Sequence, residues 1–275
     1  MALGFFLMRE AVVLVATAIA AATDIQSGEI KDWLTFPLLG AGMLLALLEP
    51  NSLQILVLGG FVFAAGYLLY VMGKIGGGDV KLFTGMALVV PFVNGMPFIL
   101  PALLYAALLS AVFWGVYYTL KYARAGIDWK LNRQNVLQAG VLGIAVLAYF
   151  WFMITSRLMP VLALAVLGVP LLCSLLFMAF EKGIKKSFFL KHVKLGALEE
   201  DEVLAQEFAE EKIRKILQGK GIMEAQDIAR LKKMGVAGVP VYRNFPKFGP
   251  FIFLGCALAF WQPTLLGAVF FQLPL

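Results

Sequence analysis

Long apolar stretches recur along this chain of 275 residues, and they restrict its fold more than any other feature. A helix needs about 20 apolar residues to cross the hydrocarbon core of a bilayer. We therefore predict an all-α polytopic membrane protein with about eight transmembrane helices, or seven if the short fourth stretch does not cross. The stretches lie near residues 4–23, 33–49, 52–73, 80–93, 97–120, 136–155, 158–180 and 248–272.

The composition agrees with a chain embedded in lipid. Hydrophobic residues make up 61% of the sequence and charged residues only 15%, whereas about 25% of the residues in a soluble domain are charged. We attribute the net charge of +6 to membrane topology and expect the lipid bilayer, not nucleic acid, as a partner. Cys173 and Cys256 lie in apolar stretches and His192 is the only histidine. These residues give no basis for a disulfide, a metal site or a cofactor.

Charged residues concentrate in segment 181–247, which holds fourteen of the 23 Lys and Arg residues and ten of the 17 acidic ones. We interpret this segment as a helical insert that faces water, with one helix over 199–218 and a second over Glu224–Met234 that ends at Gly235. The predicted domains are a catalytic membrane core at 1–123, additional membrane helices at 124–180, the insert at 181–247 and a last membrane helix at 248–275.

The basic residues also predict an orientation. If Asp24 lies on the cytoplasmic side, 21 of the 23 basic residues lie there as well, and only Arg9 and Arg157 do not. The opposite orientation would put those 21 outside, against the positive-inside rule. We therefore expect a multi-pass protein of the cytoplasmic membrane.

Two aspartates lie at the ends of apolar stretches. Asp24 ends the first stretch, and Asp79 opens the fourth directly after Gly76, Gly77 and Gly78. Two crossings separate the aspartates, so both lie at the same membrane face in either orientation. Glycine lacks a Cβ, which permits positive φ angles and lets another chain approach closely.

Two neighbouring carboxylates cannot both ionise cheaply, so they share a proton and supply an acid and a base. In aspartic proteases the ionised member activates water while the protonated member donates to the scissile carbonyl oxygen. Simpler roles stay open at this point. Asp79 would suit a helix N-cap, and Asp24 would suit a turn in the polar connector that follows it.

The sequence around each aspartate resembles that of type IV prepilin peptidases and archaeal preflagellin peptidases. The segment 76–82, GGGDVKL, is similar to their GxGD motif, and 24–30, DIQSGEI, is similar to their first-aspartate region. This resemblance implies that Asp24 and Asp79 form the dyad of an aspartic endopeptidase. Such enzymes remove short leader peptides from pilin-like or archaellin-like precursors at the cytoplasmic face.

The resemblance covers about residues 10–120. Beyond them, GIMEAQDIARLKKMGV and PKFGPFIFLG are similar to archaeal members that carry a cytoplasmic segment before a last helix, a softer match. Bifunctional bacterial members have a cysteine-bearing cytoplasmic domain and a methyltransferase activity. This chain lacks those cysteines, so we expect no methyltransferase activity.

The resemblance also implies a basic leader, which acidic side chains beside the dyad would hold. Glu29 and Asp32 lie in the connector after Asp24 and are candidates for this role. Lys81 follows Asp79 closely and would either stabilise a carboxylate or pair with lipid phosphate. The sequence does not choose between these two roles.

Three alternative functions stay open. A protease of the presenilin or signal-peptide-peptidase branch usually has Tyr-Asp at the first aspartate, whereas this chain has Thr23-Asp24. An ion-coupled transporter would use Asp24 and Asp79 for protons or cations, but it favours an internal repeat and carboxylates near the midplane. A scaffold whose insert binds a partner would leave the glycine segment unexplained.

Overall fold

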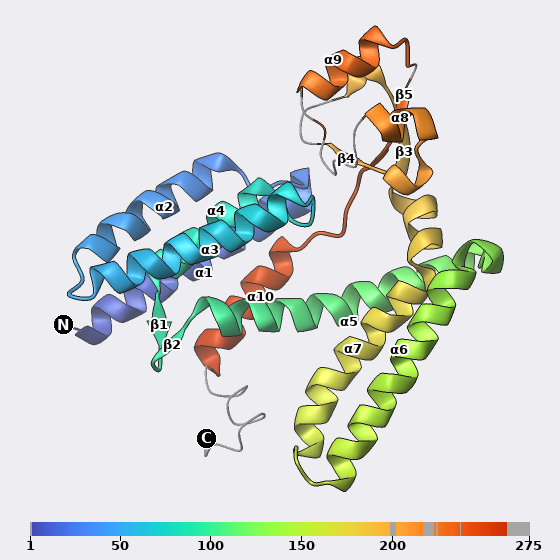
Figure 1. Ribbon diagram of the computed structural model, residues 1–275. Coiled ribbons are helices and arrows are strands. Elements are labelled where there is room, and N and C mark those ends of the chain that lie inside the picture. Colours follow the sequence, from blue (N-terminus) through green and yellow to red (C-terminus); the bar gives the residue numbers. More distant parts are fainter. Residues whose placement is uncertain (1, 199–201, 217–222, 224, 237, 263–275) are drawn as a thin grey trace.

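The computed structural model describes residues 2–198, 202–216, 223, 225–236 and 238–262 (Figure 1). Its helices are α1 (Ala2–Ser27), α2 (Asp32–Leu47), α3 (Ser52–Val71), α4 (Gly77–Val89), α5 (Ile99–Ala125), α6 (Trp129–Thr155), α7 (Val161–Ile184), α8 (Glu211–Ile216), α9 (Ala225–Lys233) and α10 (Gly249–Trp261). Its strands are β1 (Phe92–Val93), β2 (Met96–Pro97), β3 (Leu190–Lys194), β4 (Val203–Leu204) and β5 (Gly238–Tyr242). A π-helical turn (Lys185–Phe189) and two 3₁₀ turns (Leu195–Ala197 and Gln206–Phe208) connect them.

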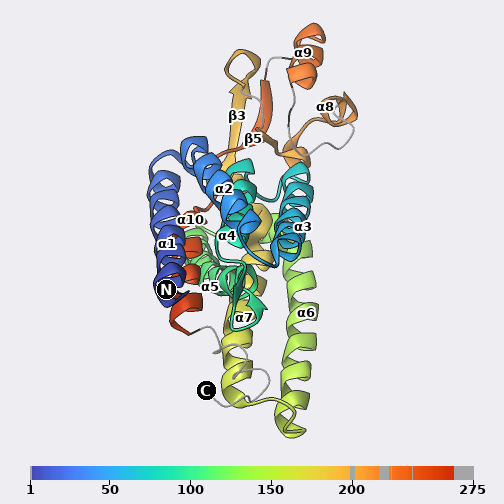
Figure 2. The same ribbon diagram turned by 90° about the vertical axis from the view of Figure 1, so that its left-hand side faces the viewer.

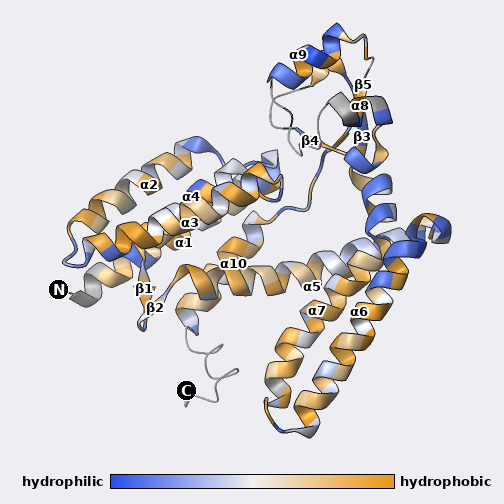
Figure 3. Ribbon diagram, in the orientation of Figure 1, coloured by the Kyte–Doolittle hydropathy of each residue, from blue (hydrophilic) through white to orange (hydrophobic). Residues whose placement is uncertain are grey.

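Five helices of the described chain are long and apolar enough to cross a membrane. They lie at Phe6–Ser27, Ser52–Val71, Ile99–Ala125, Trp129–Thr155 and Ala163–Phe189, and α2 and α10 are shorter apolar helices. The outer surface of α6 leaves Leu137, Ile144 and Trp151 between 70% and 71% exposed, which suits contact with lipid tails. Figure 3 shows that apolar residues dominate α6 and α7, whereas polar residues gather in the insert. The protein is therefore a polytopic membrane protein.

Helix α4 is the centre of a bundle formed by α1–α4. It contacts α2 on one side and α3 on the other, as Figure 2 shows, and every residue from Val80 to Val90 except Lys81 is buried. Small residues of α3 allow the close approach: a Cβ at Gly59 would lie 2.5 Å from Leu88, and one at Gly66 would lie 3.0 Å from Val80.

Helix α4 has 13 residues and ends just before Pro91, because proline cannot donate a backbone hydrogen bond. A tight hairpin of β1 and β2 follows and turns at Asn94 and Gly95, whose φ angles are 52° and 77°. Two successive positive φ angles are typical of the turn that best fits the twist of a short hairpin. This hairpin leads the chain into α5.

Helix α10 joins the first bundle to a second one formed by α5–α7. It contacts both α1 and α5 and lies between the two bundles in Figure 1. A Cβ at Gly255 would collide with the carbonyl oxygen of Ala102 on α5, so this glycine lets the two backbones meet. The last described helix thus connects the two bundles.

The prediction of a helical insert is wrong, because the insert contains a three-stranded antiparallel sheet in the order β3-β5-β4. Where we expected a helix over 199–218, the structure has β4, a 3₁₀ turn and α8; residues 199–201 and 217–218 lie outside the described chain. Val203 and Leu204 pair with β5. A short apolar run can form either a helix or a strand, and here the presence of β5 as a partner favours a strand. The second helix is confirmed as α9, with Gly235 after it at φ +67°.

Candidate active site

Asp24 lies in the last turn of α1, which continues to Ser27. The side chain is buried, and its Oδ2 accepts a hydrogen bond of 2.7 Å from the backbone N–H of Gly249. A carboxylate is disfavoured by the dipole at the C-terminal end of its own helix, and the N-terminal end of α10 supplies the opposite polarity. Asp24 therefore bonds to another helix instead of capping the connector that follows it.

Asp79 lies in the first turn of α4, three residues after Gly76. Its Oδ2 accepts a hydrogen bond of 3.1 Å from the backbone N–H of Gly76, which is the N-cap residue. Asp79 is therefore not the N-cap itself; it occupies the third helical position and reaches back, as an acidic residue there commonly does. This hydrogen bond uses only the Oδ2 atom of Asp79.

The structure brings Asp24 and Asp79 to the same end of the first bundle. Helix α1 contacts α4, and the two carboxyl groups are close enough for the charge of Asp24 to act on Asp79. The inference from the number of crossings, that the two residues share one face, agrees with this geometry. The two carboxyl groups therefore interact electrostatically across the contact between α1 and α4.

The glycine segment before Asp79 serves close packing. Gly76, Gly77 and Gly78 all lack positive φ angles, so the expectation of an unusual backbone there is wrong. The expected close approach occurs at Gly78, where a Cβ would lie 2.6 Å from the carbonyl oxygen of Ile30. At Gly77 the nearest atom would be 3.6 Å away, on Tyr70, which is an ordinary contact. Gly78 thus lets α4 rest on the connector between α1 and α2.

Both acidic side chains of that connector have basic neighbours within the chain. Asp32 accepts from Lys81 at 2.5 Å, and Glu29 accepts from Lys31 at 2.9 Å. The Lys81 ammonium also lies 4.6 Å from the ring centroid of Phe36. Lys81 therefore ties the second turn of α4 to the start of α2, two residues after Asp79 in the chain.

Residues 247–249 complete this end of the bundle. They lie in the PKFGPFIFLG segment, to which the sequence assigned no catalytic role. The Lys247 ammonium lies beside Gly28, where it would collide with any Cβ, and the Lys247 carbonyl accepts 3.1 Å from Trp114 Nε1 on α5. Gly249-Pro250 is a recognisable helix start. No pattern in the sequence, however, indicates that this helix start meets Asp24, 225 residues away.

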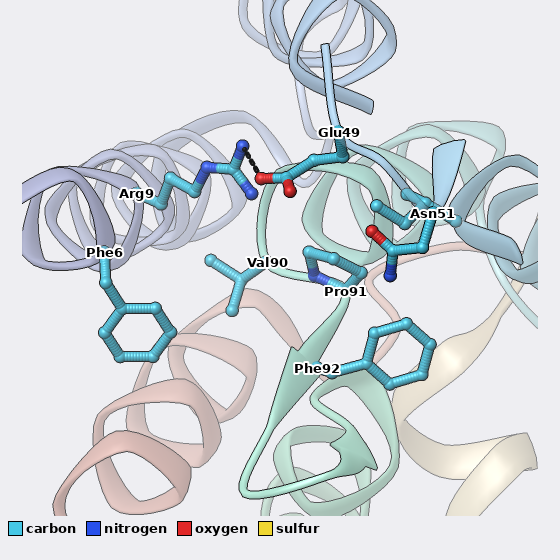
Figure 4. Close-up of a pocket in the computed structure, with 8 residues that line it drawn as sticks. Phe6, Arg9, Glu49, Asn51, Val90, Pro91 and Phe92 are labelled. Carbon is cyan, nitrogen blue, oxygen red and sulfur yellow. Dashed lines mark ion pairs between the residues drawn. The ribbon is translucent and has the colours of Figure 1, made fainter. Parts of the chain in front are cut away.

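A second polar feature lies at the opposite end of α1. Arg9 forms an ion pair of 2.8 Å with Glu49, beside a cavity of about 180 Å³ that Val90, Pro91 and Phe92 also line (Figure 4). The 15 residues from Arg9 to Asp24 rise about 22 Å along a helix. This cavity is therefore separate from the aspartate pair.

Within the described parts of the chain, no three His, Cys, Asp or Glu side chains gather as metal ligands would. Cys173 and Cys256 are buried free thiols, and His192 is exposed on β3. The site chemistry that the described residues offer is therefore that of carboxylates, backbone amides and lysines.

Comparison with known proteins gives two findings. Residues 11–117 match the model of the type IV leader peptidase family, and this range contains both aspartates. The prepilin peptidase EppA of Methanothermobacter thermautotrophicus is 40% identical over 88 residues, which cover 30% of this chain and 23% of that relative. The chain thus spans less than a quarter of this curated relative. No solved structure matches the chain significantly.

Proposed function

Because the chain belongs to the type IV leader peptidase family through residues 11–117, we propose that it is a membrane-embedded aspartic endopeptidase. Its substrates are pilin-like or archaellin-like precursors, from which it removes the short basic leader peptide. The observation that supports this proposal is that α1 and α4 contact each other and bring Asp24 close enough for its charge to act on Asp79.

The chemistry requires only the two carboxyl groups and water. The ionised carboxylate takes a proton from water as the water oxygen bonds to the scissile carbonyl carbon. The protonated partner gives its proton to the carbonyl oxygen, which yields a neutral gem-diol. The first carboxyl then protonates the leaving nitrogen as the C–N bond breaks, and the second recovers a proton from the gem-diol.

We orient the dyad toward the cytoplasm, because 21 of 23 basic residues then lie on that side. Eight crossings belong to the same proposal. Helix α4 has 13 residues, or about 20 Å against the ~30 Å of a bilayer core. It nevertheless runs from the aspartate pair to Val90, which lines the cavity of Arg9 at the other end of α1. Because α4 is shorter than the bilayer core, we expect the membrane to be thinner around this bundle.

Glu29 and Asp32 remain candidates for holding the basic leader. Both lie in or next to the connector after Asp24, and each forms an ion pair with a lysine of this chain. A basic leader would replace that lysine or bind to the same carboxylate beside it. Ion pairs at an exposed surface contribute little alone, so we expect the two residues to affect KM more than kcat.

The test combines purified protein in lipid vesicles with a pilin-like precursor that carries a basic leader, and follows its N-terminal processing by mass spectrometry. Asp24→Asn and Asp79→Asn should each lower kcat by about 10²–10⁴-fold. The amide oxygen that replaces each carboxylate oxygen can still accept from Gly249 or Gly76, so folding and precursor binding should persist. Processing at the normal rate by either variant would exclude the dyad.

Asp128 offers a matched control. It caps α6 by accepting from the Leu131 N–H at 3.0 Å, so Asp128→Asn makes the same chemical change at another helix end. Processing by this variant should equal that of the unmodified protein, because the side chain lies on a different element from both dyad residues.

A further inference from the structure

The N-terminal end of α10 has one spare donor, and it points at Asp24. Pro250 has no N–H, while the N–H groups of Phe251 and Ile252 bond to the carbonyl of Phe248 at 3.0 and 3.1 Å. Of the first four positions, this leaves the N–H of Gly249, which donates to Asp24 at 2.7 Å. The Gly249 N–H at the start of α10 thus forms a hydrogen bond with Asp24 on α1.

This contact leaves no room for a side chain at Gly249. A Cβ there would lie 2.9 Å from Asp24 Cβ, 3.0 Å from its Oδ2 and 3.1 Å from the Cα of Ala21. Glycine is therefore required for the backbone amide to reach the carboxylate. The position of α10 is fixed in turn by Trp114, whose Nε1 donates to the carbonyl of Lys247.

Charged groups near this end of the bundle lie on α4, in the linker before α10 and at the start of α2. Asp79 on α4 repels a negative charge on Asp24. Lys247, in the linker before α10, brings a positive charge beside Gly28. Lys81 on α4 is paired with Asp32 at the start of α2, and α10 itself carries no charged residue.

The two remaining charges, Glu29 and Lys31, belong to the connector and neutralise each other at 2.9 Å. The hydrogen bond from α10 at 2.7 Å is also shorter than the 3.1 Å bond that Asp79 accepts from Gly76. Asp24 thus bonds to the N-terminus of a helix other than its own, whereas Asp79 bonds to the N-cap residue of its own helix.

We propose that the N-terminus of α10 is a third part of the active site, in which the Gly249 amide holds the Asp24 carboxyl group in its catalytic orientation. Gly249 acts through Asp24 and is a positioning residue. This catalytic role rests on the proposed protease function, whereas the hydrogen bond between Gly249 and Asp24 is independent of that function.

The first test compares kcat and KM of Gly249→Ala with those of the unmodified protein. The variant should lower kcat about tenfold or more and leave KM within about threefold, because the Asp24 carboxyl group is then misplaced for the reaction. Gly255→Ala is the control in the same helix: it strains the contact with Ala102 on α5 but should leave kcat within about threefold of normal. An unchanged kcat in Gly249→Ala, or an equal loss in Gly255→Ala, overturns the proposal.

A second variant removes the donor without adding an atom. Replacing Gly249 by glycolic acid turns its amide into an ester, which keeps the space around Asp24 unchanged. The ester variant should reproduce the loss of kcat, and it tests the proposal if Gly249→Ala does not fold. A folded ester variant with the original kcat would show that the amide has no such role.

The readout that separates this inference from the protease function is carboxyl ¹³C NMR of labelled aspartate, assigned by subtraction with Asp24→Asn and Asp79→Asn. The Asp24 resonance should move in the ester variant and stay in place in Gly255→Ala. If no precursor is processed yet this difference holds, the function fails and the contact stands. If processing occurs but the ester leaves the Asp24 resonance unchanged, the role of the Gly249 amide fails alone.

Discussion

The close approach at Gly78 makes a sharp prediction, because an adjacent glycine provides its control. In Gly78→Ala the new Cβ would lie 2.6 Å from the backbone oxygen of Ile30, and an ordinary contact begins at 3.4 Å. The start of α4 must then retreat by about 0.8 Å. The Ile30 oxygen belongs to the backbone, so it cannot rotate away as a side chain would.

This displacement should act mainly on catalysis. Asp79 follows Gly78 directly, so it moves with the start of the helix, and a misplacement of about 1 Å in an active site costs about 10²-fold in rate. We expect kcat to fall by about 10- to 100-fold. The free energy of unfolding should fall by only about 0–2 kcal/mol, since overpacking costs about 1–3 kcal/mol and alanine returns up to about 1 kcal/mol of helix propensity.

Gly77→Ala makes the same change one residue earlier. Its Cβ would lie 3.6 Å from Tyr70, which is an ordinary contact, so kcat should stay within about twofold of normal. Both variants are assayed for precursor processing and for thermal unfolding in detergent. Normal kcat in Gly78→Ala, or an equal loss in Gly77→Ala, would refute the argument that the Ile30 contact sets the position of Asp79.

Two further predictions concern charges. Glu29→Gln and Asp32→Asn should raise KM for precursors with basic leaders and leave kcat nearly unchanged; equal KM values for basic and neutral leaders in the unmodified protein would contradict the proposed role. Arg9→Met should lower the free energy of unfolding by about 3 kcal/mol, because it leaves Glu49 without the ion pair of 2.8 Å. Denaturant unfolding would measure this loss, which should be smaller when Glu49→Leu is added, and kcat should be unaffected at a site about 22 Å away.

Much of the membrane core could be predicted because lipid imposes a simple rule. Apolar stretches of a certain length become helices, and counting them is enough to put Asp24 and Asp79 at one face. The short length of α4 also follows from the length of its apolar stretch. These inferences need no knowledge of which helices are neighbours.

The remaining features depend on contacts between distant segments. The bond from Gly249 to Asp24 joins residues 225 positions apart, and nothing in the local pattern around either residue specifies it. In the insert, Val203 and Leu204 form a strand because β5 lies beside them, although their spacing equally suits the stripe of a helix. Tertiary pairing thus decides where local preference is weak.

The same pairing of strands suggests how the insert is joined to the membrane core. Leu190 and Tyr242 are partners at one end of the β3–β5 ladder, so their Cα atoms lie about 5 Å apart, and the chain between them can be replaced by a two-residue Asn-Gly turn. This variant retains residues 243–248, which lead into α10, and should therefore retain the contact of Gly249 with Asp24. We expect it to process the precursor within about tenfold of the normal kcat, because it keeps Gly249 and Gly76, the hydrogen-bond donors of Asp24 and Asp79. A deletion that extends through Lys247 should lose processing, since α10 is then no longer held by Trp114. Loss of processing in the first variant, with folding and α10 intact, would instead assign substrate binding to the insert.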